Sequence, residues 1–188
     1  KEGLSVPLIL QTADEVEADL ILLGAKDRYP LTNYLFGSVS AELITTTSLP
    51  VLCVPENYTF QPIRQIAFAT ELEGKDYPMA LQLRTFVEML KAKVCPFFVN
   101  QLPSDFSNKK EEEWHTNNLP YTNEKAAKVT VVRERNVTEG IAYYLKQHPS
   151  QILAMYTYQR SFIQQLFHRS ATQQMVTHTN IPLLIYRK

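Results

Sequence analysis

Apolar and polar positions alternate along the chain in a rhythm typical of alternating strands and helices. Short apolar runs predict buried strands, and segments whose apolar residues recur every three or four positions predict amphipathic helices. Strands are expected at residues 20–23, 51–54, 65–70, 94–99, 129–132, 152–155 and 181–185. Helices are expected at 6–16, 38–46, 77–93 and 170–179, with another that starts at the N-cap Asn136. This order indicates a parallel sheet with helices on both faces, an open α/β fold.

One stretch of this pattern occurs twice. Residues 9–54 recur without a gap at 141–186, at a constant offset of 132 residues. Identical residues stand at equivalent positions, among them Arg28 and Arg160, Ser38 and Ser170, and Pro50 and Pro182. A period this long indicates tandem domains, since the repeats of solenoid proteins span roughly 20 to 50 residues.

The offset also sets the expected domain boundaries. The counterpart of the strand at 65–70 would fall before residue 1, so we expect residues 1–55 to form only the C-terminal half of a first domain. Residues 56–62 are then a linker, and residues 63–188 a complete second domain. On this interpretation the sequence is an N-terminally truncated part of a longer protein.

A half-domain of two strands leaves one sheet edge unpaired and one apolar face exposed to solvent. It is also smaller than the size at which a single hydrophobic core usually stabilises a domain. We therefore expect it to dock. Pairing between strands 51–54 and 183–186 is the favoured contact, either within the chain or in a homodimer. The alternative is that the missing half completes the domain in the longer protein.

Composition excludes several classes of partner. The 19 basic and 19 acidic residues give zero net charge, so no general attraction to nucleic acid or anionic lipid is expected. No apolar run approaches the roughly 20 residues that cross a bilayer, and we expect a cytoplasmic protein. Cys53 and Cys95 lie in apolar runs and are expected to be free core thiols. The scattered histidines predict no metal site.

Candidate chemistry gathers after the strand at 20–23. Ligands of open parallel sheets bind outside the carboxyl ends of the strands. Gly24 is expected to let the chain turn tightly off this strand. Gly37, Ser38 and Val39 then open a helix, and the free amides of a helix N-terminus attract phosphate.

These residues resemble the universal stress protein family. Its nucleotide-binding members carry a glycine, two residues, a second glycine, nine residues, and then Gly-Ser or Gly-Thr. Gly24, Gly37 and Ser38 fall on that spacing, with Asp27 at the second glycine. The resemblance covers the whole chain. It implies a flavodoxin-like or Rossmann-like sheet of strand order 3-2-1-4-5, and antiparallel pairing of fifth strands across a dimer or tandem pair.

The second copy departs from the family pattern. Tyr156, Gln159 and Arg169 stand where the three glycines would be, and only Ser170 is kept. Side chains there would intrude where the backbone must approach a phosphate, so the nucleotide cradle is expected to be lost.

Other residues could support weak binding of a nucleotide or a small anion. The resemblance implies that Glu71 is the family's acidic residue at the end of the first strand, which contacts the ribose or adenine of the nucleotide. Asp27 would repel phosphate unless a neighbouring Lys26 or Arg28 compensates. Arg169 and Ser170 are candidates for a residual anion site, together with the basic side chains of Arg160 and His168. The alternative is that these arginines are solvated loop residues.

Three functions follow from the sequence. The first is a regulatory or protective stress protein that acts through dimerisation, is not an enzyme, and has no certain cofactor. The second is a weak ATP or AMP sensor that uses the first-domain loop of the full-length protein. The third is a slow nucleotide hydrolase or small-anion binder. The chain has no Gly-x-Ser-x-Gly elbow and no Gly-Lys-Ser/Thr loop, which removes the commonest signs of a hydrolase or phosphate-loop NTPase.

Overall fold

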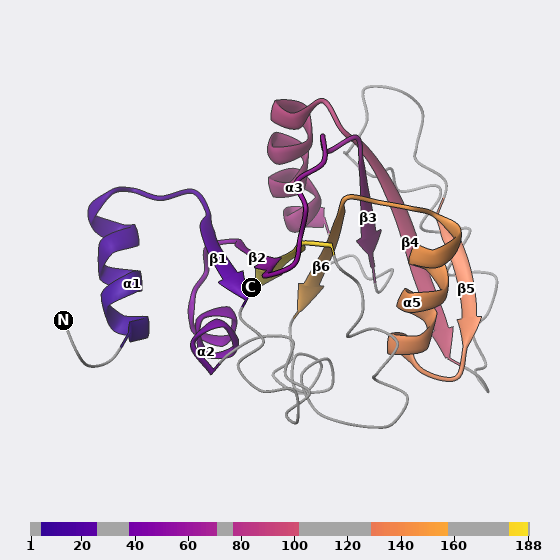
Figure 1. Cartoon of the computed structure of the whole chain (residues 1–188), viewed down its shortest axis with the longest axis horizontal. Helices are drawn as coiled ribbons and strands as arrows, with labels where there is room; N and C mark the ends of the chain where they lie inside the picture. Colours follow the sequence, from indigo (N-terminus) through magenta and orange to yellow (C-terminus); the bar gives the residue numbers. More distant parts are fainter. Residues whose placement is uncertain (1–4, 26–37, 71–76, 102–128, 158–180, 188) are drawn as a thin grey trace. The chain divides into compact units, whose positions relative to one another are not determined.

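The structure, a computed structural model, describes residues 5–25, 38–70, 77–101, 129–157 and 181–187 (Figure 1). The chain forms two compact units. The first contains residues 1–59 and 157–188, and the second contains residues 60–156. The division after residue 59 lies within the predicted linker at 56–62, but residues 157–188 group with the beginning of the chain and not with the predicted second domain.

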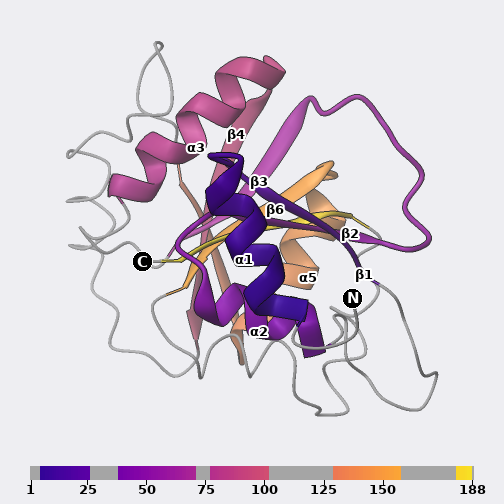
Figure 2. The same ribbon diagram turned by 90° about the vertical axis from the view of Figure 1, so that its left-hand side faces the viewer.

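The first unit is a small α/β layer. Its elements are α1 (Ser5–Glu15), β1 (Ile21–Ala25), α2 (Ser38–Thr46), β2 (Val51–Pro55) and β7 (Leu183–Arg187). Strand β1 pairs with β2 in parallel, and β2 pairs with β7 antiparallel. Helices α1 and α2 contact each other, and both are seen in Figure 2. The predicted helix at 38–46 is confirmed with its bounds unchanged.

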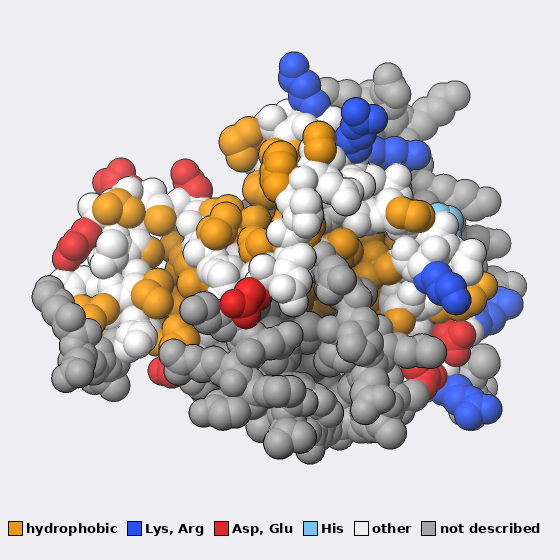
Figure 3. Space-filling model, viewed as in Figure 1, with side chains coloured by type: hydrophobic (Ala, Val, Ile, Leu, Met, Phe, Trp, Pro, Cys, Tyr) orange, Lys and Arg blue, Asp and Glu red, His pale blue; other side chains and the backbone are white. Residues whose placement is uncertain are grey.

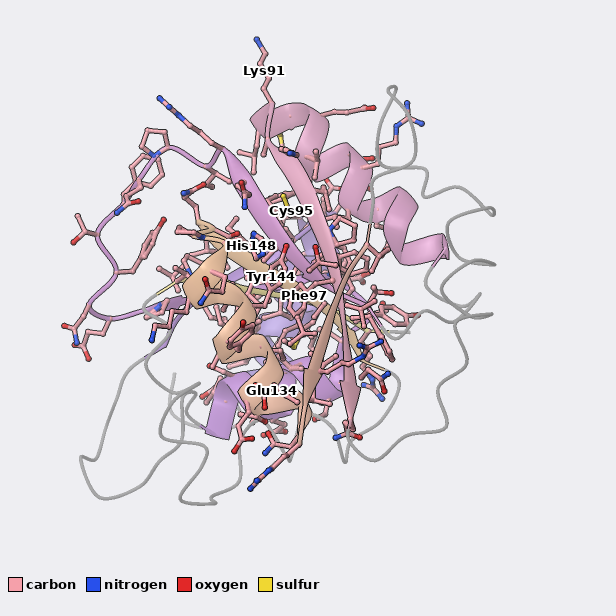
Figure 4. All side chains as sticks on the ribbon, turned by 90° about the vertical axis from the view of Figure 1, so that its right-hand side faces the viewer. Lys91, Cys95, Phe97, Glu134, Tyr144 and His148 are labelled. Carbon is pink, nitrogen blue, oxygen red and sulfur yellow. The ribbon has the colours of Figure 1, made fainter. Side chains whose placement is uncertain are left out.

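The second unit is a parallel sheet. Its elements are β3 (Gln65–Ala69), α3 (Tyr77–Leu90), β4 (Lys93–Gln101), β5 (Thr130–Glu134), α5 (Val137–Gln147) and β6 (Ile152–Thr157). The strands pair in the order β6-β3-β4-β5. This matches the predicted order for the first four strands of the domain. Figures 2 and 4 show α3 and α5 on opposite sides of the β3–β4 pair.

Strand β3 is the centre of this sheet. Ile66, Ala67 and Phe68 have no exposed surface, so consecutive residues are buried on both faces. That confirms the interpretation of the unbroken apolar run as a central strand. From α3, Leu83 and Val87 are buried four residues apart, as the helical spacing predicts.

Helix α3 ends earlier than predicted. The lysines at the end of the 77–93 pattern suggested a longer helix, but Lys91 takes a left-handed φ of 51°. Its N–H donates to the Glu88 carbonyl, and the Ala92 N–H donates to the Val87 carbonyl. These two bonds form a Schellman motif, which stops the helix and lets Lys93 begin β4.

Helix α5 lies close to β4. Its N-cap is Asn136, as predicted, whose side chain accepts from the Glu139 N–H at 2.9 Å. A Cβ added at Gly140 would clash with the Val99 side chain, so the glycine permits the helix to approach the strand. One turn later Tyr144 stacks on Phe97 with ring centroids 3.8 Å apart (Figure 4).

The sequence repeat has a structural counterpart. Helices α1 and α5 begin and end at positions 132 residues apart, and so do strands β2 and β7. Strands β1 and β6 end at Ala25 and Thr157, which are separated by the same offset. Equivalent stretches of sequence therefore form equivalent elements.

The two equivalent strands β2 and β7 pair with each other inside the chain. Val51 is opposite Ile185, Leu52 opposite Leu184, and Cys53 opposite Leu183. Because Leu52 and Leu184 are equivalent in the repeat, the ladder is symmetric about this central pair. Such self-complementary pairing is the kind that a two-fold axis produces between identical subunits. The chain makes this contact internally.

Cys53 in β2 gives the folded state a pH dependence. Its side chain is fully buried and free, as predicted, and burial raises its thiol pKa from 9.0 to about 12. The unfolded chain therefore releases this proton first as the pH rises. The stabilisation is complete below pH 9.0 and is lost as the pH rises toward 12.

We expect the free energy of unfolding of the wild type to fall more steeply above pH 9.0 than that of Cys53→Ala. Urea unfolding at a series of alkaline pH values measures both slopes. Tyr144 and Tyr186, whose pKa values burial also raises, are present in both proteins, so their contribution cancels. Parallel slopes would contradict the assignment to Cys53.

Candidate functional site

The candidate site of the second unit lies at the carboxyl ends of β3 and β6. From β3 the chain continues to β4 and β5 on one side, whereas β6 pairs with the other side of β3. The strand order reverses between β3 and β6, which is where ligands of open α/β sheets bind. Ala69 pairs with Met155 at this end, so Thr70 and Tyr156 follow as neighbouring strand ends.

Tyr156 fills space at this point. It is a residue of β6, and only 8% of its surface is exposed. Its equivalent in the first copy is Gly24. A phenol ring is therefore buried at the position where the first copy has no side chain at all.

Gly24 itself differs from its expected role. It lies inside β1, paired with Val54, and does not have the left-handed φ of a tight turn. The turn predicted there is wrong, because pairing with β2 keeps the backbone extended through Ala25. The residue is exposed, and a Cβ added to it would meet nothing within 4 Å. Gly24 thus leaves open space beside the end of the strand.

The other end of the same loop is the start of α2. The helix begins at Ser38, as predicted, and has no acidic residue in its first turn. Val39 is half-buried and Ser40 is buried, with 6% exposed. The backbone of this first turn provides amides and a positive dipole end that favour an anion.

Several predicted site residues lie outside the described residues. They are Asp27, Gly37, Glu71, Gln159, Arg160, His168, Arg169 and Ser170. The predicted helix at 170–179 lies there as well. Gly24, on strand β1, and Ser38, at the start of α2, both lie in the first unit. Tyr156 lies in the second unit, at the point between β3 and β6 where the strand order reverses.

Two polar residues at the same end of the second sheet were not singled out from the sequence. Thr70 follows β3 and is buried, and its N–H donates to the Phe97 carbonyl at 3.0 Å. Asn100 is buried near the end of β4. In the sequence, each of these two polar residues lies at or near the end of an otherwise apolar strand. Such a position places a hydrogen-bonding group at the sheet edge where ligands bind.

Charged side chains are distributed among several surfaces. Figure 3 shows acidic side chains around α1 and the turn after it, and lysines and arginines near α3. Among the residues that the structure describes, no three His, Cys, Asp or Glu side chains gather into a possible metal site. Of the helices in that same part of the chain, none has the length and apolar character to cross a membrane.

Comparison with known proteins supports the family resemblance. Residues 1–55 match the model of the universal stress protein family. A curated relative, the stress response protein NhaX of Bacillus subtilis (strain 168), is 38% identical over 53 residues. That alignment covers 28% of this chain and 32% of NhaX, so it spans about a third of the relative's length.

Solved structures share the fold across the chain. A functionally unknown protein, PA1789 of Pseudomonas aeruginosa PAO1, is similar with a TM-score of 0.66 and 16% identity, covering 100% of this chain and 69% of its own. A putative universal stress protein from Pseudomonas aeruginosa UCBPP-PA14 has a TM-score of 0.64 and 17% identity, with the same coverage. A universal stress protein from Archaeoglobus fulgidus DSM 4304 has a TM-score of 0.66 and 13% identity, covering 97% of this chain and 66% of its own.

Proposed function

We propose that this chain, whose residues 1–55 match the universal stress protein family, is a regulatory or protective stress protein that works by binding and self-association and not by catalytic turnover. Its two copies are tandem domains of the family, the second of which has lost the nucleotide site. The protein acts in the cytoplasm.

The observation that carries this proposal is the buried side chain of Tyr156. In an open α/β sheet the phosphates of a nucleotide need close approach to the backbone at the strand ends. Tyr156 is 8% exposed at that point of the second unit, so its ring occupies volume that a bare backbone would leave free. Displacing the ring would expose a large apolar surface, which opposes binding.

A second candidate function is a weak ATP or AMP sensor in the first copy. The open space at Gly24 favours it, since a Cβ there meets nothing within 4 Å. The start of α2 at Ser38 also presents the helix terminus that a phosphate prefers. A slow hydrolase or small-anion binder remains the third candidate, and its proposed residues Arg169 and Ser170 lie outside the described part of the chain.

A thermal-shift experiment separates the first two functions. We expect neither ATP nor AMP at millimolar concentration to raise the unfolding midpoint of the full-length protein. A sensor at a hundred times its dissociation constant would gain about 2.7 kcal/mol, a shift of roughly 5–10 °C for a chain of this size. Such a shift would overturn the first function.

A variant at Gly24 locates any binding. Gly24→Tyr installs the second copy's residue at the equivalent exposed position, where the open space lets the protein fold. If the sensor uses the first-copy loop, this variant loses the ATP shift, whereas Gly24→Ala, with its single methyl group, keeps most of it. A shift that survives Gly24→Tyr would place the nucleotide elsewhere.

Self-association is the other part of the proposal. The fifth strands, predicted to carry a homodimer, are paired with each other as β2 and β7 in one chain. A dimer through these strands therefore requires exchange, with β2 of each chain replacing that of the other on β7. The symmetric register about Leu52 and Leu184 makes such an exchange possible without new contacts.

A further inference from the structure

Helix α1 ends in the same backbone turn as helix α3. Glu17, after α1, has a φ of 50°, and Lys91, after α3, has a φ of 51°. The Glu17 N–H donates to the Asp14 carbonyl, and the next N–H donates to the Ala13 carbonyl. These are the same two bonds that end α3, so α1 also ends in a Schellman motif.

The two turns carry opposite charges. Glycine is the usual residue at the left-handed position of a Schellman motif, because it has no Cβ to clash there. The chain has Glu17 at this position in one turn and Lys91 in the other, and both residues are exposed. Charged residues of opposite sign thus stand where the backbone favours glycine, which indicates a role for their charge.

The acidic turn, residues 14–17, is unfavourable for its own helix. Asp14, Glu15 and Glu17 are exposed at the carboxyl end of α1, and the last turn of that helix has no basic residue. The negative end of the helix dipole and mutual repulsion both oppose three carboxylates at this place. A cationic partner offsets both effects.

The exposure of the acidic turn belongs to its position in the fold. Its equivalents in the repeat, residues 146–149, are exposed as well, although in the second unit β3 lies beside β6. Lys146 stands at the position equivalent to Asp14, so the two copies also differ in the sign of their charge here. The turn is therefore a surface that a domain of this kind presents to solvent.

The basic turn, residues 89–93, lies at the amino ends of β3 and β4. Lys91 and Lys93 are exposed. The Lys93 N–H donates to the carbonyl of Arg64, which is also exposed. Three cationic residues therefore gather at this end of the second unit.

Among the residues that the structure describes, acidic side chains do not neutralise this end of the unit. Glu88 is close to the basic turn, but it pairs with Arg84 at 2.6 Å. Figure 4 shows Glu134 at the opposite end of the unit from Lys91. Glu139, in the first turn of α5, follows Glu134 at that opposite end. The basic turn thus keeps a net positive charge.

Each turn also carries an exposed apolar side chain. Val16 in the acidic turn is 67% exposed, and Met89 in the basic turn is 71% exposed. Figure 3 shows hydrophobic side chains beside the acidic ones at α1 and beside the lysines and arginines near α3. An apolar centre with polar residues around it is the usual anatomy of a protein–protein interface.

We propose that the acidic turn of one copy of this chain docks on the basic turn of a second copy. Glu17 and its acidic neighbours then face Lys91 and Lys93, and Val16 packs against Met89. The contact is heterologous, because it joins two different surfaces. It rests on the self-association in the proposed function, and it uses neither the fifth strands nor the nucleotide loop.

A second copy fits the basic turn better than a nucleic acid or an anionic membrane does. Either of those partners would leave the acidic turn without a cationic partner. A phosphate backbone is recognised by basic and hydrogen-bonding groups, which gives no role to the exposed Met89. The two turns of this chain match in backbone shape, in charge and in apolar content, so one contact satisfies both.

Sedimentation velocity across a concentration series tests the contact in the full-length protein. We expect association at about 0.01 M salt that weakens toward 1 M, because the Debye length falls from about 30 Å to 3 Å over this range. Exchange of the fifth strands buries apolar residues and does not weaken in this way.

Charge reversal locates the contact. Lys91→Glu combined with Lys93→Glu makes both turns acidic and weakens association about tenfold or more, equivalent to roughly 1.4 kcal/mol. The variant folds, because the same turn already holds Glu17 in α1. The matched control reverses the exposed Arg133 and Arg135 to glutamate, with the same change in net charge at the opposite end of the unit. This control associates like the wild type.

Mixing two reversed variants tests the pairing of the turns. Replacing Asp14, Glu15 and Glu17 by lysine makes both turns basic, and lysines suit the carboxyl end of a helix. This variant also loses self-association. When it is mixed with the variant whose turns are both acidic, the two associate, because each supplies the charge that the other lacks.

The outcomes separate the proposals. A protein that stays monomeric at all concentrations overturns both this contact and the proposed self-association. Association that responds neither to salt nor to either reversal overturns the contact of the turns alone and supports exchange of the fifth strands. A control that weakens association as much as the lysine reversal, or a mixture that does not recover it, also overturns the contact.

Discussion

Replacing Tyr144 by alanine is expected to lower the free energy of unfolding by about 3–5 kcal/mol, the range for deletion of a buried aromatic ring. Tyr144 is 2% exposed and lies between Phe97 and His148, with ring centroids 3.8 Å and 4.5 Å away (Figure 4). Its hydroxyl donates to the Cys95 carbonyl at 3.4 Å. Alanine would leave a cavity between α5 and β4 and remove both stacking contacts. Urea unfolding followed by circular dichroism measures the loss.

The neighbouring tyrosine provides a matched control. Tyr143 is on the same helix but 53% exposed, so Tyr143→Ala should change the free energy of unfolding by about 0.5 kcal/mol or less. Tyr144→Phe keeps the ring and loses only the hydroxyl, at a cost of about 0.5–1.5 kcal/mol. Equal losses for the two alanine variants would contradict the packing of α5 on the sheet.

These two tyrosines illustrate how far the sequence predicts the fold. Helical spacing places Ile141 and Tyr144 on one face and turns Tyr143 away, and the N-cap at Asn136 fixes where the helix begins. Strand order follows from the alternation of elements and the family resemblance. The end of α3 could not be predicted in this way, because its Schellman turn at Lys91 uses a left-handed lysine where glycine is the usual signal.

The candidate site was less predictable from sequence. The repeat aligns Tyr156 with Gly24 and so identifies it from the sequence, and its burial follows from the apolar strand that contains it. The predicted turn at Gly24 is wrong. A glycine after an apolar run suggests a turn, but the register with Val54 extends β1 past it, and pairing is a tertiary effect that local sequence does not encode. Thr70 and Asn100 were missed for the same reason, since only the strand order brings their ends to one edge.

A row of three leucines across the first sheet gives the second large prediction. Leu22, Leu52 and Leu184 stand opposite one another on β1, β2 and β7, with exposed fractions of 63%, 8% and 0%. We expect Leu184→Ala to lower the free energy of unfolding by about 2–5 kcal/mol. Leu52→Ala should lower it by an amount toward the lower end of that range. Leu22→Ala should lower the free energy of unfolding by about 0.5 kcal/mol or less, because the Leu22 side chain is already mostly exposed to water in the folded state. Urea unfolding of dilute protein measures each variant without contribution from association.

The double variants test the pairing register itself. Leu52 and Leu184 are direct cross-strand neighbours, so their alanine substitutions should couple by about 0.5–3 kcal/mol. Leu22 and Leu184 are two strands apart, roughly 10 Å, and their effects should add within about 0.5 kcal/mol. If the effects of the Leu52 and Leu184 substitutions were instead additive, the two strands would not pair at these residues. The symmetric ladder that joins the ends of the repeat would then be absent, and with it the reason for expecting the fifth strands to exchange between chains.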